Sequence, residues 1–216
     1  HDAVLTGAVM AHVRTRDTDM SDTLTCVLAG RDPNIDGVPA ADILAAHAEY
    51  VASAGACGRA ADFGECDMRG LESLAAHDLT GLKAAKAVFC GLDMRGCKLQ
   101  GASLEQADLR GVDLREADLR GVNLCGARLN RADLRGCDLG PLLMDDERLR
   151  PARLAGAVLR YANLCGTSLR NADLTGCDLR WAETSDADFS DACLDGTLRY
   201  ESAELPVDSH DDAADG

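Results

Sequence analysis

Cysteine is the residue type in this chain with the most chemical potential, since the 216 residues include ten cysteines. A thiol can ligate zinc, form a disulfide or act as a nucleophile. Zinc sites usually bring two ligands together at Cys-x-x-Cys or a similar short spacing. No two cysteines here have that spacing, so the cysteines do not predict a metal centre.

The five histidines are equally scattered, at positions 1, 12, 47, 77 and 210, and no two have a metal-ligand spacing. No combination of serine, histidine and aspartate, no phosphate-binding glycine loop and no convergent carboxylate pair stands out. His47 lies in a predicted helix, where we expect it to be a packed cap residue. The sequence therefore predicts no catalytic residue, no cofactor and no metal, and a protein that is not an enzyme.

A strict period of five residues dominates the chain, and the backbone that it specifies determines where the other side chains lie. From Phe89 to Leu194 every fifth residue forms a series of 22 positions, 17 of them leucine, and the residue two places earlier is usually small. Steps of five would scatter around an α-helix without forming an apolar stripe. In an extended segment, Ala107 and Leu109 point to one side and Asp108 to the other. Gly111 then permits a sharp corner.

A chain that turns every five residues closes a square after four repeats, and the next twenty residues stack on it at about 4.8 Å. This geometry predicts that Leu109, Leu129 and Leu169 lie above one another. It also predicts that Leu119, Leu134 and Leu159 are fully buried. The predicted core ladder consists of Leu99, Leu104, Leu109, Leu114, Leu119, Leu124, Leu129, Leu134, Leu139, Leu154, Leu159, Leu164, Leu169, Leu174, Leu179, Phe189 and Leu194.

The runs Ala107-Asp-Leu-Arg-Gly, Ala117-Asp-Leu-Arg-Gly and Ala132-Asp-Leu-Arg-Gly closely resemble the pentapeptide-repeat proteins. The resemblance implies an all-β solenoid, a right-handed quadrilateral β-helix with leucine along its axis. The segment from Ile43 to Phe63 resembles a helical lead-in found before many bacterial arrays. We therefore expect one N-terminal capping helix that covers the open end of the coil.

In this geometry the cysteines gain a structural explanation. Cys66, Cys97, Cys137 and Cys177 occupy the small inward position. The last three are forty residues apart, so we expect them two coils apart on one face, at about 9–10 Å. That separation is too long for a disulfide. Buried, free thiols indicate a reducing, cytoplasmic location.

The chain divides into four predicted parts. Residues 1–30 keep a degraded repeat and are interpreted as the remnant of an upstream array, so we expect the chain to be a piece of a longer protein. Residues 31–58 form a linker and the capping helix, and 59–200 form the main β-helix, with a one-residue slip near Gly70. Residues 140–151 keep the count of five but lose the residue pattern, which predicts a bulge or a modified coil. Residues 201–216 form an acidic tail that we expect to be disordered.

The formal charge of −15 is unevenly distributed. Residues 89–200 contain 18 acids and 15 bases, whereas 201–216 contain six acids and no base. Where aspartate precedes and arginine follows the leucine, the two should form weak surface pairs, as in Asp113/Arg115, Asp118/Arg120, Asp133/Arg135 and Asp178/Arg180. Register predicts one column of Arg95, Arg115 and Arg135, and another of Arg160 and Arg180. The candidate interaction surface comprises Arg95, Arg115, Arg135, Met144, Asp145, Asp146, Glu147 and Arg148.

These observations favour a non-catalytic scaffold that binds an unidentified protein partner, because repeat folds present regular faces over a constant core. The alternative is a DNA mimic that modulates gyrase, as the resemblance to quinolone-resistance members of the family implies. The near-neutral coil argues against it, although acids gather near Glu183 and Asp195. We expect no DNA binding, no membrane association, and either a monomer or an end-to-end dimer.

Overall fold

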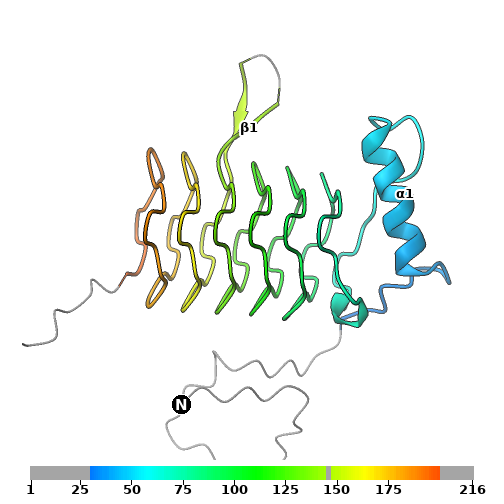
Figure 1. The fold of residues 1–216 in the computed structure, drawn as a ribbon, viewed down its shortest axis with the longest axis horizontal. Coiled ribbons are helices and arrows are strands. Elements are labelled where there is room, and N and C mark those ends of the chain that lie inside the picture. The colour runs from blue at the N-terminus through cyan, green and yellow to red at the C-terminus, as the bar shows by residue number, and fades with distance from the viewer. Residues whose placement is uncertain (1–29, 145–146, 200–216) are drawn as a thin grey trace, which may run out of the picture.

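The computed structural model describes residues 30–144 and 147–199 as a stack of square coils, with one helix at its N-terminal end and one hairpin on its side (Figure 1). The helix α1 spans Ala40–Ala52, and a short 3-10 turn η1 spans Met68–Gly70. The strands β1 (Leu142–Leu143) and β2 (Leu149–Arg150) form the hairpin. Neighbouring coils pair in parallel twenty residues apart, as Asp93 pairs with Asp113. Four repeats of five residues therefore make one turn of a quadrilateral coil.

Each repeat uses its backbone in the same way, and Leu109 shows how. Its N–H donates a hydrogen bond of 2.8 Å to the carbonyl of Arg128 in the next coil, and its carbonyl accepts one of 3.2 Å from Val112 at the corner. Gly111, between them, has a φ of 64°. Glycine recurs at this corner position because few other residues adopt a positive φ without strain.

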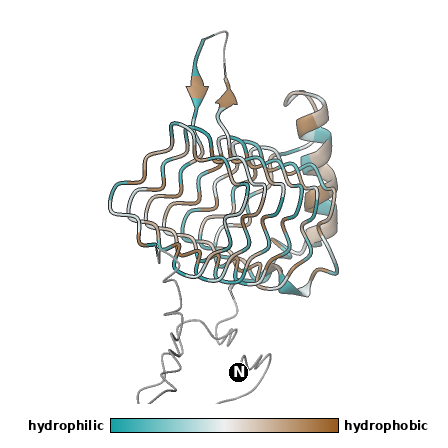
Figure 2. Ribbon diagram, turned by 60° about the vertical axis from the view of Figure 1, so that its left-hand side comes forward, coloured by the Kyte–Doolittle hydropathy of each residue, from teal (hydrophilic) through white to brown (hydrophobic). Residues whose placement is uncertain are grey.

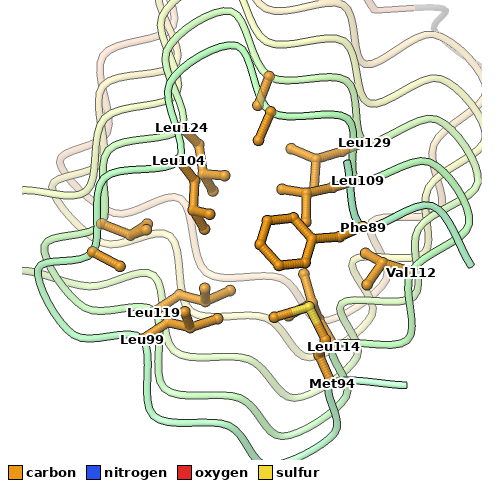
Figure 3. Close-up of a cluster of buried hydrophobic side chains, with 14 of the residues drawn as sticks. Phe89, Met94, Leu99, Leu104, Leu109, Val112, Leu114, Leu119, Leu124 and Leu129 are labelled. Atoms are coloured by element: carbon orange, nitrogen blue, oxygen red, sulfur yellow. The ribbon is translucent and has the colours of Figure 1, made fainter. Parts of the chain in front are cut away.

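The interior of the coil is filled by stacked apolar side chains. Figure 3 shows Leu124 over Leu104, Leu129 over Leu109, and Leu119 over Leu99. The fifteen leucines of the ladder from Leu99 to Leu179 are at most 3% exposed. Each of these leucines therefore contributes its full apolar surface to one continuous core.

The helix α1 packs against the first coil. Ala40 and Leu44 join the apolar core, and the buried His47 accepts a 3.1 Å hydrogen bond at Nδ1 from the N–H of Ala61. Before the helix, Arg31 already pairs in parallel with Cys66. Figure 1 shows α1 at the N-terminal end of the stack, where Ala40 and Leu44 contribute to the apolar core.

The first coil is one residue longer than the next. Asp62 pairs with Lys83, 21 residues later, whereas Asp78 pairs with Lys98, 20 residues later. The extra residue is accommodated by η1, whose N-cap Asp67 accepts a hydrogen bond from the N–H of Arg69. The slip therefore lies where the pattern placed it, next to Gly70.

The 140–151 interruption is a protruding β-hairpin. Leu142 pairs with Arg150, and Leu143 with Leu149, in antiparallel orientation. The coils below and above it pair at Asn123 and Arg153, thirty residues apart instead of twenty. The hairpin therefore removes ten residues, two whole repeats, from the coil and leaves the five-residue frame intact.

This excursion makes one register prediction wrong. Arg128 pairs with Val158, so Leu159, not Leu169, lies over Leu129. For the same reason the predicted cysteine column holds for Cys97 and Cys137 but fails at Cys177. Cys137 and Cys177 are on different sides of the coil, because Asp138 pairs with Ser168, and Asp178 with Val158.

The last coil is less buried than the ladder predicted. Phe189 and Leu194 are only half-buried, because no further described coil covers them. The guanidinium of Arg199 lies 4.7 Å from the ring centroid of Phe189 and partly covers this end. The predictions for the upstream remnant, for Asp145 and Asp146 and for the acidic tail fall on residues 1–29, 145–146 and 200–216, which lie outside the described residues.

Candidate interaction surfaces

The hairpin carries the most exposed large aliphatic side chains among the described residues. Leu143 is 63%, Met144 52% and Leu149 59% exposed. Figure 2 shows these hydrophobic strands outside the body of the coil. Two of them, Met144 and Leu149, are members of the five-residue series that the coil would otherwise have buried. Apolar side chains held out in water are typical of a protein-binding surface.

The base of the hairpin is fixed on the coil. A Cβ atom added to Gly121 would lie 2.7 Å from the Cβ of Leu142 and 3.2 Å from the carbonyl oxygen of Arg150. One coil earlier, Gly101 would approach the Leu142 side chain to 3.5 Å. The approach at Gly121 is too close for a residue with a Cβ atom, whereas the contact at Gly101 is of ordinary van der Waals length, so Gly121 seats the base of the hairpin.

The arginine column of the candidate surface exists as predicted by the twenty-residue register. Arg95 contacts Asp93 at 2.8 Å and Asp113 at 3.7 Å, and Arg115 contacts Asp113 at 2.7 Å and Asp133 at 3.6 Å. The hydrogen bonds from Arg95 hold the pKa of Asp93 well below its usual range. Each positive charge of this column therefore stands beside carboxylates, which makes the column a ladder of ion pairs rather than a basic patch.

The structure separates the two halves of the predicted surface. The arginine column follows the side of the coil that contains Leu134, whereas the hairpin leaves the corner after Leu139 on the next side. Met144, Glu147 and Arg148 are exposed on the hairpin. The sequence prediction thus combined two surfaces that lie one side of the square apart.

A different side carries an excess of arginine. We call it the arginine face, the outward surface over Leu109, Leu129, Leu159 and Leu179 with the corner that follows them. Asp108 contacts Arg110 at 2.7 Å and Arg128 at 3.8 Å. Asp178 contacts both Arg160 and Arg180 at 2.6 Å.

Arginine neighbours lower the pKa of both aspartates of this face. Hydrogen bonds from Arg180, and then from Arg160, lower the pKa of Asp178. Burial alone would raise the pKa of Asp108, but the hydrogen bonds from Arg110 lower it overall. Each carboxylate is thus shared by two guanidinium groups, and arginines outnumber aspartates on this face.

An aromatic stack borders the arginine face. The rings of Tyr161 and Trp181 lie 4.9 Å apart at an angle of 4°, and the guanidinium of Arg131 lies 5.2 Å from the Tyr161 centroid. Tyr161 is 42% and Trp181 46% exposed. Both have a positive φ, at a corner where glycine stands in earlier coils. Sequence analysis missed this stack, although Tyr161 and Trp181 are twenty residues apart and share a register position.

The described residues offer little for catalysis. No group of three or more His, Cys, Asp or Glu among them could hold a metal ion. Burial raises the pKa of Cys97, Cys137 and Cys177 to about 12, and each thiol donates to a leucine carbonyl. Such thiols are poor nucleophiles at neutral pH. Within the described ranges, no helix has the length and apolar character needed to cross a bilayer.

The sequence matches the family model of pentapeptide repeats, with eight copies over residues 78–111, 102–140 and 148–183. No curated protein matches the sequence significantly.

Several solved structures are similar to this chain, and the likeness to HetL supports a right-handed quadrilateral β-helix. HetL, a pentapeptide repeat protein involved in heterocyst differentiation regulation from the cyanobacterium Nostoc sp. strain PCC 7120, is 28% identical, with 66% of this chain and 69% of HetL covered and a TM-score of 0.50. Rfr23 from the cyanobacterium Cyanothece 51142 is 30% identical over 51% of this chain and 61% of its own, with a TM-score of 0.22. Full-length QnrB1, a plasmid-mediated fluoroquinolone resistance protein, is 15% identical, with 66% of this chain and 92% of QnrB1 covered and a TM-score of 0.20.

Proposed function

Since the repeat region of this chain belongs to the pentapeptide-repeat family, we propose that the protein is a non-catalytic scaffold that binds a partner protein through the β1–β2 hairpin. The observation that carries the proposal is the exposure of Leu143, Met144 and Leu149 on a hairpin whose base is seated on the coil. Binding energy in protein interfaces concentrates in a few apolar anchors that a partner pocket can enclose.

The rest of the coil supports this proposal. Its leucine core is constant from coil to coil, so outward residues can vary without cost to the fold. An interruption of ten residues that preserves the frame adds a side-chain surface while the stacking above and below it continues. HetL, which is involved in the regulation of heterocyst differentiation, supports a regulatory binding role by analogy. Buried free thiols support a reducing compartment, and we propose the cytoplasm.

The DNA-mimic alternative receives less support from the charges. A mimic needs rows of unpaired carboxylates along its faces. Here Asp93, Asp113 and Asp133 are each bound by an arginine, and the arginine face is positive. We therefore favour the protein scaffold over a gyrase modulator.

Differential affinity capture tests the proposal. The bait is the full chain, and the matched variant carries Leu143→Ser, Met144→Ser and Leu149→Ser. A control variant carries Arg95→Gln and Arg135→Gln on another side of the coil. A partner retained by the wild type and the control but lost by the hairpin variant is the expected result. Equal capture by all three proteins would exclude the hairpin as the binding site.

A further inference from the structure

The arginine face has no role in the hairpin proposal. Its excess of arginine over aspartate favours the binding of an anionic segment. In residues 30–144 and 147–199 it is the one side of the coil where basic residues outnumber acidic ones: Arg110, Arg128, Arg131, Arg160 and Arg180 stand against Asp108 and Asp178. The whole chain has a net charge of −15, so this positive surface lies within a strongly acidic protein.

The occupant with the best complementarity is encoded in the same chain. Residues 201–216 contain six acidic side chains and no lysine or arginine. Leu198, one of the last described residues, pairs with Asp178, so the chain leaves the coil from the arginine face itself. The corner of the preceding coil in that column is the position of Trp181.

We propose that the acidic segment 201–216 docks on the arginine face of its own coil and covers the Tyr161–Trp181 stack. Reach is sufficient. The pairs linking Asp108, Arg128, Val158, Asp178 and Leu198 are four coil steps, about 19 Å at 4.8 Å per step. Sixteen extended residues reach about 50 Å. A tethered segment also has a millimolar effective concentration, which compensates for weak individual contacts.

The type of contact follows from the residues. Arg128, 45% exposed as a side chain, and the exposed Arg131 lie near the middle of the face and can attract the carboxylates. The run Leu205-Pro206-Val207 is apolar and close to the start of the segment. It can pack against the exposed rings of Tyr161 and Trp181. Such docking needs no regular structure in the segment, because charge attraction and one apolar contact are sufficient.

Trp181 reports on this docking, because it is the single tryptophan of the chain. The experiment measures acrylamide quenching of its fluorescence in four full-length proteins beside the wild type. One, the amide protein, has the six carboxylates of 201–216 changed to amides. A second carries Arg128→Gln and Arg131→Gln, and a third carries Arg128→Lys and Arg131→Lys. The fourth, the control, carries Arg115→Gln and Arg135→Gln. Thermal melts establish that all five are folded.

We expect quenching to rise in the amide protein and in the Arg128→Gln/Arg131→Gln protein, and to stay at the wild-type level in the lysine and control proteins. In 1 M salt, where the Debye length is about 3 Å, the wild type should become as quenchable as the amide protein. A synthetic peptide of residues 201–216 should protect Trp181 of the amide protein from acrylamide. When Arg128→Gln and Arg131→Gln are added to the amide protein, the affinity for this peptide should fall at least about tenfold, or 1.4 kcal/mol.

Two results would overturn the proposal. Equal quenching of the wild type and the amide protein in low salt would show that the segment does not cover Trp181. Binding of a single-stranded oligonucleotide to the wild type through Arg128 and Arg131 would show that the occupant is a nucleic acid. The hairpin is not involved in these measurements, so they are independent of the scaffold proposal.

Discussion

Asn123 pairs in parallel with Arg153, thirty residues further along the chain, whereas Ser103 in the coil below pairs with Asn123, only twenty residues further along. The ten additional residues leave the coil as the hairpin and return in frame. A hairpin inserted in whole repeats is separable from the fold, because no core leucine depends on it. This relationship gives the first prediction.

Replacing residues 141–151 with a single glycine should restore a twenty-residue coil and keep the protein folded. We expect the free energy of unfolding to change by less than about 1 kcal/mol, a shift of roughly 2–4 °C in Tm. Glycine suits the restored corner, because the equivalent Gly121 has a φ of 63°. Circular dichroism melts measure the effect. Loss of the folded signal would mean that the hairpin supports the coil.

The same arithmetic explains what the sequence could and could not predict. The sides of the coil follow from the alternation around each leucine, so burial of residues such as Leu109 and Leu134 is a local property. The hairpin has a length of two repeats and does not disturb the count of five. The hairpin was indicated by Leu142 and Glu147, which occupy positions where the other repeats usually have a small residue.

Contacts across the hairpin could not be derived from a fixed register. The approach of Arg131 to Tyr161 requires the offset of thirty residues, and the displacement of Cys177 from the Cys97 column has the same origin. The stack of Tyr161 on Trp181 lies beyond the hairpin, where the offset is again twenty, and was accessible from the sequence. Exposure of Phe189 and Leu194 depends on what lies above the last coil, which the repeat pattern does not specify.

A second prediction compares the inside of the coil with its surface. Leu134 is fully buried, so Leu134→Ala should reduce the free energy of unfolding by about 2–5 kcal/mol. Arg120 contacts Asp118 at 2.6 Å, but its side chain is 39% exposed. Arg120→Ala should therefore cost less than about 1 kcal/mol. Urea unfolding of both variants measures the difference, and equal losses would contradict the assignment of inner and outer residues.

Thiol reactivity provides a third prediction. Cys57 and Cys193 are exposed and should react with a maleimide in the folded protein. Cys97, Cys137 and Cys177 should react only after unfolding, because they are buried and burial raises their thiol pKa to about 12. Mass spectrometry of peptides after labelling at pH 7 and pH 9 measures the pattern. Rapid native labelling of Cys137 would be inconsistent with a closed core.

His47 gives the fourth prediction, a pH dependence at the helical end. Burial lowers its pKa from the usual 6.5, and its Nε2 is buried without a hydrogen-bond partner. Protonation of Nδ1 would also remove the acceptor for Ala61. Below about pH 6.5 His47 is protonated in the unfolded chain but still neutral in the folded protein. The free energy of unfolding should therefore decrease as the pH falls from 6.5 to the lowered pKa, and become constant below that pKa.

Urea unfolding between pH 7.5 and pH 5 measures this dependence. His47→Asn keeps an acceptor at the position of Nδ1 without a titrating group, so this slope should disappear. His77→Asn, at an exposed histidine, is the matched control and should keep the slope. An identical slope in the wild type and in His47→Asn would assign the pH dependence to other groups.

The last prediction concerns DNA and gyrase, and it rests on where the charges lie. A DNA mimic presents unpaired carboxylates in rows, whereas Asp93, Asp113 and Asp133 are bound by Arg95, Arg115 and Arg135. Residues 201–216 contain six acids and no base, whereas residues 89–200 contain 18 acids and 15 bases. We therefore expect low-micromolar protein to leave supercoiling by gyrase unchanged, and a labelled duplex to show no binding.

The assay is most sensitive in about 0.01 M salt, where the Debye length is about 30 Å and electrostatic mimicry is strongest. It compares the wild type with the protein whose six carboxylates in 201–216 are amides. Inhibition by both proteins would place the inhibitory surface on the coil and favour the gyrase modulator over the scaffold. Inhibition by the wild type alone would assign the effect to the acidic segment acting as a polyanion, because the two proteins share every coil residue.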